Sequence, residues 1–327
     1  MIESTANLKA SNLKQSNQKQ SNSTIMEHEA ADKKAASVFL IITNFINTRI
    51  MISKVYALFF SPTLTTKKVT EAIAKGVAEA LNAANNPNVE VVPADVTTPA
   101  LRSEAAFGFD NTTLVVFGVP VYIGRVPNLL KDYLSTIEGN GAIGVPVVVY
   151  GNRAYDDALL ELKDMMEGNE FKCIAGAAFI GEHSFSTTLG GGRPNENDLE
   201  IAEAFGKEIA EKLSGYNGKK LEVPGNYPYK FFDARNTQNK GIDIRKVQPL
   251  TNPDKCNNCG LCATLCPMGS INPQDCSEVT GKCIKCCACI KRCPSGAKYF
   301  TDPTYLEHKE ILEKNFTHPA KTPELFW

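Results

Sequence analysis

The sequence predicts an α/β protein in which a doubly wound parallel sheet is followed by a smaller, cysteine-rich α+β domain. Three observations predict this arrangement. Near-continuous apolar runs alternate with amphipathic stretches between residues 54 and 214, as parallel strands covered by helices on both faces require. Two cysteine runs of identical spacing follow between residues 256 and 293. The chain of 327 residues is also long enough for two folded units.

Five apolar runs are the expected strands of the sheet. They lie at residues 54–60, 89–94, 112–118, 144–150 and 171–180. Helical periodicity predicts one helix from the turn after the first strand to Leu81 and others at residues 127–138, 155–167 and 198–214. Five strands connected in this way fit the order 2-1-3-4-5 of one group of open parallel sheets, and we assign this domain to residues 51–215.

Residues 1–50 are expected to lie outside the fold. Residues 1–36 are rich in Ser, Asn, Gln and Lys and offer little to bury, which is the composition of a disordered tail. Because Met51 stands just before the first strand, a misassigned start codon is one interpretation of this extension. Organellar targeting is the other, favoured only by Lys33 and Lys34 ahead of a weak apolar run.

Three further segments complete the expected organisation. Residues 216–249 lose periodicity and are rich in Gly, Pro, Asn and aromatic residues, which indicates a linker that packs against a domain. Residues 250–302 contain the cysteine runs, and residues 303–327 form a C-terminal tail. Because the tail ends in Phe326 and Trp327, we expect it to dock on a surface that the sequence does not identify.

Composition and charge narrow the class of protein. With 43% hydrophobic and 22% charged residues, the chain has the composition of a soluble globular protein. Its net charge of -1 gives no electrostatic case for a nucleic-acid or membrane-surface partner. The apolar stretch from Val38 to Ile42 is far shorter than the ~20 residues of a membrane helix, so no membrane span is expected.

The two cysteine runs indicate iron–sulfur clusters. The first is Cys256-x-x-Cys259-x-x-Cys262-x-x-x-Cys266-Pro267, and the second is Cys283-x-x-Cys286-x-x-Cys289-x-x-x-Cys293-Pro294. In bacterial-type 4Fe-4S proteins, the cysteine before proline binds the cluster of the other run. This rule assigns Cys256, Cys259, Cys262 and Cys293 to one 4Fe-4S cluster, and Cys283, Cys286, Cys289 and Cys266 to the second.

Zinc is the alternative for these cysteines, but zinc sites use two well-separated pairs and seldom a third cysteine at the same gap. Cluster thiolates need a reducing environment, so we expect a cytoplasmic and anaerobic setting. Cys173, Cys276 and Cys287 fall outside the pattern and are expected to have no role, although Cys287 could serve as a redox-sensing thiol. Five basic residues between Gly281 and Phe300 offset cluster charge and form either a solvated face or a docking patch.

A hydroxyl-rich turn between the first strand and the first helix is a candidate phosphate site, since helix N-termini favour anions. Its residues are Ser61, Thr63, Leu64, Thr65 and Thr66. Here the sequence resembles the flavodoxin family, whose FMN phosphate loop has the form Ser/Thr-x-Thr-Gly-x-Thr. Leu64 occupies the glycine position, where leucine resists backbone conformations that glycine adopts.

The resemblance extends to the loops after the third and fourth strands, which hold the isoalloxazine ring in flavodoxins. It implies a cofactor-binding set composed of Pro120, Val121, Tyr122, Ile123, Gly124, Tyr150, Gly151, Asn152, Tyr155 and Asp156. Tyr122 and Tyr155 are then the stacking aromatics, and the Gly124 peptide faces flavin N5. The alternative is that both tyrosines only cap the core. The GxGxxG string at Gly139–Gly144 is rejected as a dinucleotide site because it precedes a strand.

Taken together, residues 54–300 resemble the flavodoxin/ferredoxin fusion proteins of anaerobic microbes. The resemblance implies FMN, two 4Fe-4S clusters, and electron transfer between one- and two-electron carriers, with a ferredoxin, oxidoreductase or hydrogenase as redox partner.

Two alternatives to this function stay open. One is an FMN-dependent reductase of a small quinone-like acceptor fed by ferredoxin, and the other is a flavin-free docking domain that results from Leu64. His183 and Arg193, in stretches that similar proteins share, are the catalytic candidates of the reductase, although an ordinary loop histidine is the simpler interpretation. No enzymatic activity is assigned from the sequence.

Overall fold

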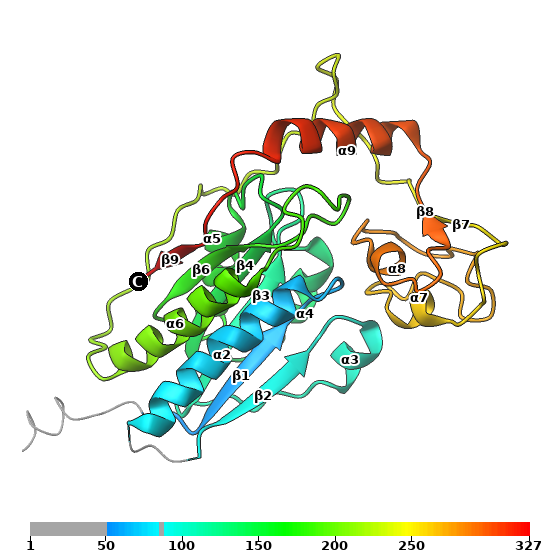
Figure 1. Ribbon diagram of the computed structural model, residues 1–327. Coiled ribbons are helices and arrows are strands. Elements are labelled where there is room, and N and C mark those ends of the chain that lie inside the picture. The colour runs from blue at the N-terminus through cyan, green and yellow to red at the C-terminus, as the bar shows by residue number, and fades with distance from the viewer. Residues whose placement is uncertain (1–50, 85–87) are drawn as a thin grey trace, which may run out of the picture. The chain divides into compact units, whose positions relative to one another are not determined.

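Seven strands form one sheet that is parallel except at one edge (Figure 1). The computed structural model describes residues 51–84 and 88–327, so the expectations for residues 1–50 lie outside the described residues. The strands are β1 (Lys54–Phe59), β2 (Glu90–Asp95), β3 (Thr113–Pro120), β4 (Ile143–Tyr150), β5 (Lys172–Cys173), β6 (Gly176–Ile180) and β9 (Glu324–Phe326).

The order β2-β1-β3-β4-β6 confirms the predicted order 2-1-3-4-5. The expected fifth strand is divided into β5 and β6, and both pair in parallel with β4. Beyond β6 the C-terminal strand β9 pairs antiparallel, with Ala177 opposite Leu325. The tail therefore covers a sheet edge that would otherwise expose unpaired backbone groups.

Helices cover both faces of the sheet, as the doubly wound prediction requires (Figure 1). On one face, α2 (Thr65–Ala83) and α6 (Glu196–Leu213) pack against apolar side chains of β1, β3, β4 and β6. On the other face lie α5 (Ala158–Gly168) and the short turns η1 (Asn128–Leu130) and α4 (Lys131–Leu134). The short helix α3 (Pro99–Glu104) follows β2. Because the main strands are parallel, the loops at their carboxyl ends gather at one edge of the sheet.

The cysteine-rich part is small and contains both helix and strand, as predicted. Strands β7 (Leu250–Thr251) and β8 (Lys298–Tyr299) pair antiparallel at its two ends. Two single-turn helices, α7 (Leu261–Thr264) and α8 (Ala288–Lys291), each carry the third cysteine of a run. The two runs thus form matching local structures.

The segment between the two parts lies against the sheet domain. Asp157, at the start of α5, accepts hydrogen bonds from the backbone N–H groups of Asn226 (2.8 Å) and Lys230 (2.7 Å). The guanidinium of Arg125 lies 4.8 Å from the ring centroids of both Tyr229 and Phe231. These contacts hold the linker along α5 and the loop after β3.

The C-terminal tail forms helix α9 (Pro303–Phe316) before it reaches β9. At its end the Trp327 ring packs 4.9 Å from Phe205 of α6 and lies under the Lys212 ammonium. The tail thereby links the cysteine-rich part to the far edge of the sheet. Within residues 51–84 and 88–327, no helix is both long and apolar enough to cross a membrane.

Candidate functional site

The candidate phosphate loop precedes α2. Leu64 adopts φ +69°, the left-handed conformation that glycine favours. The Ser61 side chain is buried, and its hydroxyl accepts the Lys67 backbone N–H at 2.9 Å. As the first residues of the helix, Thr65 and Thr66 have backbone N–H groups without intrahelical acceptors. Leu64 therefore adopts a glycine-like backbone conformation despite its side chain, and the role of this loop toward a phosphate stays a prediction.

The loop after β3 is a tight turn in which Tyr122 and Arg125 exchange two backbone hydrogen bonds, at 3.0 and 3.1 Å. Its central residues, Ile123 and Gly124, both have positive φ, and the Ile123 side chain is exposed. A Cβ atom on Gly124 would lie 2.4 Å from a carboxylate oxygen of Asp156. Glycine is thus required where the loops after β3 and β4 meet. The role of the Gly124 peptide toward flavin N5 stays a prediction.

The loop after β4 has its side chains engaged by the C-terminal segment. The Tyr155 hydroxyl donates to Glu324 of β9 at 2.8 Å, and the Tyr155 ring packs 5.4 Å from the Tyr150 ring. The Asn152 amide donates to the Phe316 carbonyl at 2.6 Å, and its side-chain oxygen accepts the Lys321 N–H at 2.9 Å. These partners lie more than 160 residues away along the chain, which is why the sequence did not reveal them.

His183 and Arg193 follow β6. The His183 ring packs on Gly151, where a Cβ atom would lie 2.4 Å from the imidazole. Burial, together with the nearby side chains of Lys291, His308 and Arg153, lowers the pKa of His183 to about 3, so the imidazole is neutral.

Arg193 has structural partners. It forms an ion pair with buried Asp198, which belongs to the capping box of α6, and it donates to the Lys321 carbonyl at 3.2 Å. Its contacts hold the start of α6 against the C-terminal segment.

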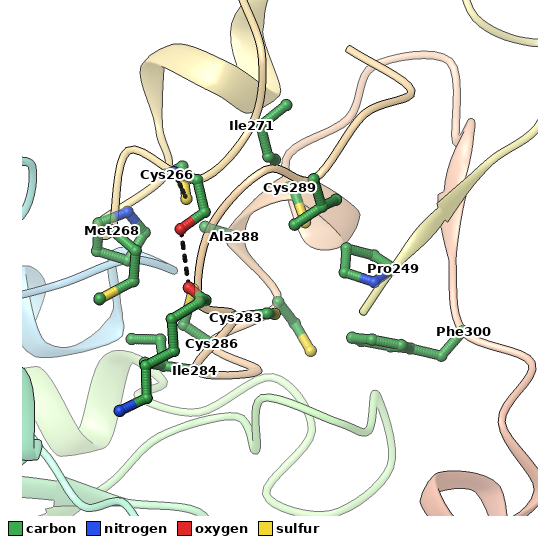
Figure 2. A pocket seen from close by; sticks show the side chains of 15 residues that line it. Pro249, Cys266, Met268, Ile271, Cys283, Ile284, Cys286, Ala288, Cys289 and Phe300 are labelled. Carbon is green, nitrogen blue, oxygen red and sulfur yellow. Dashed lines mark hydrogen bonds between the residues drawn. The ribbon is translucent and has the colours of Figure 1, made fainter. Parts of the chain in front are cut away.

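Five cysteines line one cavity in the cysteine-rich part (Figure 2). Cys266 belongs to the motif of the first run, Cys283, Cys286 and Cys289 belong to the motif of the second, and Cys287 lies outside the motif. The four motif cysteines are the set that the spacing rule assigns to one cluster, and their shared role stays a prediction. Apolar side chains complete the wall: Pro249, Met268, Ile271, Ala288 and Phe300.

The four motif cysteines of this cavity fit a cuboidal iron–sulfur cluster, because soft sulfur donors from two runs line one largely apolar space. The backbone N–H of Ser270 donates to the Cys266 sulfur at 3.3 Å, and that of Lys285 donates to the Cys283 sulfur at 3.4 Å. Burial raises the pKa of the Cys286 thiol well above its usual value, and a bound metal deprotonates such a thiol.

The other predicted set has a similar backbone but a more open setting. Asn258 and Gly260 of the first run have φ +52° and +74°, and the corresponding Lys285 and Cys287 have φ +56° and +60°. Cys287 thus stands where the first run has glycine. The Asn252 N–H donates to the Ala297 carbonyl, which brings the start of the first run beside the end of the second. Membership of Cys256, Cys259, Cys262 and Cys293 in one cluster stays a prediction.

Two cysteines outside the motif lie beside it. Burial and a hydrogen bond with Cys276 raise the pKa of Cys262 to about 11, and the Cys287 sulfur lies 3.6 Å from the Tyr305 hydroxyl of α9. In residues 51–84 and 88–327, no three or more His, Cys, Asp or Glu side chains are close enough to hold a single metal ion. The cysteines of Figure 2 line a cavity instead.

The second cysteine run contacts the candidate flavin loops. Ile284 packs against the core that also contacts Tyr122. Burial, followed by the charges of Cys286 and Cys287, raises the pKa of Tyr122 well above its usual value. Tyr122 of the loop after β3 and Ile284 of the second run thus pack on one core cluster.

Lys291 of α8 fixes this contact. Its ammonium donates to the Glu182 carboxylate at 2.6 Å and to the backbone carbonyls of His183 and Ser186 at 2.7 and 2.8 Å. The sequence showed Lys291 only as one of several basic residues near the cysteines. Its partners follow β6, so only the folded chain identifies its role.

Comparison with known proteins supports part of this picture. Residues 249–272, which include the first cysteine run, match the family described as 4Fe-4S binding domain. No curated protein sequence matches the chain. The chain thus combines a flavodoxin-like sheet order with a 4Fe-4S binding segment, as the resemblance to fusion proteins predicted.

Several solved structures are similar to the chain. A flavodoxin from the domain Archaea is 18% identical, covers 49% of this chain and 98% of its own length, and gives a TM-score of 0.34. A Streptococcus pneumonia TIGR4 flavodoxin is 18% identical, covers 49% of this chain and 99% of its own length, and gives a TM-score of 0.32. A flavodiiron protein from Giardia intestinalis is 16% identical, covers 51% of this chain and 38% of its own length, and gives a TM-score of 0.32. These scores add no argument, so the fold assignment rests on the strand order itself.

Proposed function

We propose that this protein transfers electrons between two 4Fe-4S clusters in its cysteine-rich part and FMN bound by the sheet domain. The observation that carries the proposal is the packing of the second cysteine run on the sheet domain. Ile284 of that run packs on the core that also contacts Tyr122 of the candidate flavin loop, and Lys291 donates to the Glu182 carboxylate after β6. When bound, the clusters exchange single electrons and FMN accepts two, so their combination links one- and two-electron carriers.

On the sheet domain, the loop before α2 binds the FMN phosphate. Ser61, Thr63, Thr65 and Thr66 supply hydroxyl groups, and the first N–H groups of α2 supply further donors. The left-handed conformation of Leu64 supports this role and weakens the flavin-free alternative. Tyr122 is the stacking aromatic. Tyr155 is not given that role, because its hydroxyl and ring are engaged by Glu324 and Tyr150.

In the cysteine-rich part, Cys266, Cys283, Cys286 and Cys289 hold one cluster, and Cys256, Cys259, Cys262 and Cys293 hold the other. The apolar wall of the cavity at Cys266, Cys283, Cys286 and Cys289 excludes water from the cluster that these residues hold. Two buried cations lie nearby: Lys285 donates to the Cys283 carbonyl at 2.9 Å, and Lys298 donates to the Cys276 carbonyl. Their positive charges offset part of the negative charge of thiolate-bound clusters.

The partner of this site is a one-electron redox protein of the ferredoxin, oxidoreductase or hydrogenase class, in a reducing compartment that keeps thiols such as Cys259 unoxidised. The reductase alternative depended on an open site beside His183. In the structure, His183 is packed on Gly151 and lies near the cationic side chains of Lys291 and Arg153, so no observation favours this alternative.

Anaerobic purification followed by iron, sulfide and flavin analysis tests the proposal. We expect about eight iron ions and about one FMN per chain, since each 4Fe-4S cluster contains four irons. A chain that contains FMN but only about four irons would hold one cluster and not two. A chain that contains no flavin under these conditions would contradict the proposal.

A further inference from the structure

The two cysteine runs share one spacing and one backbone conformation, but they differ in exposure. In the first run, Asn257, Asn258 and Cys259 are all exposed. The corresponding residues of the second run are half-buried Ile284, Lys285 at 7% exposure and Cys286 at 8%. Because the motif is the same, the difference comes from what lies against each run.

This chain itself covers the second run. Ile284 packs on the core of the sheet domain, which also contacts Tyr122. From the other side, the Tyr305 hydroxyl of α9 contacts Cys287 at 3.6 Å, and the Tyr305 ring packs 4.2 Å from Phe300. Another protein therefore has no free approach to the second run along these sides.

The first run is bordered by exposed residues that we call the outer rim: Asn257, Asn258, Thr264, Pro294, Ser295 and Gly296. The two stretches of the rim adjoin, because Asn252 accepts the Cys256 N–H at 3.1 Å and donates to the Ala297 carbonyl at 2.8 Å. No member of the rim is charged. Next to it, exposed Asp254 and Lys255 carry opposite charges that cancel.

We infer that a soluble one-electron redox protein docks on the outer rim, so that the first run faces the partner and the second run faces the flavin loops. This inference rests on the proposed function. The inference goes beyond the proposed function because it assigns an outward role to one cysteine run and an inward role to the other, although both runs have the same spacing. Because the rim is uncharged, docking relies on short-range contacts, and its rate depends only weakly on salt.

A soluble paramagnetic chelate tests the exposure without any partner. A dysprosium chelate shortens the electron-spin relaxation time of a reduced cluster, and this effect is stronger when the chelate can approach the cluster more closely. We expect strong enhancement for the first-run cluster and little for the second-run cluster. The variant Cys259→Ser replaces one sulfur ligand of the first-run cluster with an oxygen ligand. The EPR signal that shifts in this variant therefore belongs to the first-run cluster. Equal enhancement of both clusters, or stronger enhancement of the second, overturns the inference.

A matched pair of threonine variants tests the docking surface. Thr264 lies on the outer rim, whereas Thr280 is exposed beside Val279, which lines the second-run cavity. Each hydroxyl donates to a nearby carbonyl, at 3.3 and 3.4 Å, so the two substitutions remove similar contacts. We expect Thr264→Trp to weaken binding of a dithionite-reduced two-cluster ferredoxin about tenfold by calorimetry, and Thr280→Trp to change it less than about twofold.

The result separates this inference from the proposed function. If the wild-type chain contains both cofactors but Thr264→Trp binds ferredoxin normally, or if the Thr280 variant is the weaker binder, the docking assignment is wrong and the relay stands. If Thr264→Trp instead abolishes a dimer of this chain, the rim is a self-association surface and the docking assignment is also wrong. If the wild-type chain contains no flavin, the proposed function fails, while the chelate experiment still decides which run is exposed.

Discussion

Leu64 shows how one residue can depart from a motif and keep its geometry. Its φ of +69° lies in the left-handed region that glycine adopts without strain. A non-glycine residue in this region costs about 1–2 kcal/mol in backbone energy. The 19-residue helix α2 and the Leu64–Ser61 backbone hydrogen bond maintain the conformation.

Replacing Leu64 separates backbone strain from side-chain packing. Leu64→Gly removes both the strain and the half-buried side chain, whereas Leu64→Ala removes only the side chain. We expect Leu64→Gly to be more stable than Leu64→Ala by about 1 kcal/mol in urea unfolding, with FMN retained in both. Equal stability of the two variants would show that the backbone at residue 64 is not strained.

Tyr122 and Tyr155 are equivalent candidates in the sequence but not in the structure. Tyr155→Phe removes a hydrogen bond to the Glu324 carboxylate, so we expect it to cost about 1–2 kcal/mol of stability and leave the flavin absorbance spectrum unchanged. Tyr122→Leu should shift that spectrum and weaken FMN binding. A spectral change in the Tyr155 variant, with none in the Tyr122 variant, would exchange their roles.

His183 gives the protein a defined acid sensitivity. Because its folded-state pKa is lowered to about 3, the native state stays neutral while the unfolded chain takes up a proton below about pH 6.5. Stability therefore falls as pH drops below that value, by roughly 1 kcal/mol per pH unit. Urea unfolding at pH 7 and pH 5.5 should show this loss in the wild type and a smaller one in His183→Gln. Identical slopes would mean that His183 titrates normally.

At the scale of elements, α8 is fixed to the loop after β6 through Lys291. One ammonium group satisfies a carboxylate and two backbone carbonyls. We expect Lys291→Ala to cost about 2 kcal/mol, because these acceptors lose a charged donor, and to slow ferredoxin-driven reduction of FMN. Lys282→Ala, an exposed lysine beside the same run, is the control and should behave as the wild type. Equal effects of both substitutions would show that positive charge near the run matters and position does not.

The sequence predicted the elements that depend on local pattern. The strand order followed from continuous apolar runs separated by helices, and the spacing singled out four of the five cysteines that line the cavity. It did not predict which run is covered, because Ile284 and Asn257 occupy equivalent positions of one motif. Burial there depends on packing with the loop after β3, with α9 and with the loop after β6, which no local pattern records.

At the scale of the whole molecule, the C-terminal segment was the least predictable part. The sequence indicated only that Phe326 and Trp327 would dock. In the structure, the segment passes from the cysteine-rich part over Asn152 and Tyr155 to the sheet edge at β6. A three-residue strand and a single terminal tryptophan are too short to predict a pairing partner from periodicity. Its contacts also explain why two residues of the predicted flavin loop have structural partners.

The central claim is that one chain holds two one-electron centres and one two-electron centre in a single relay. An anaerobic reductive titration, followed by absorbance and EPR, tests it most directly. The account predicts uptake of about four electrons per chain, one for each cluster and two for FMN. Uptake of about two electrons, with only cluster or only flavin signals, would contradict it.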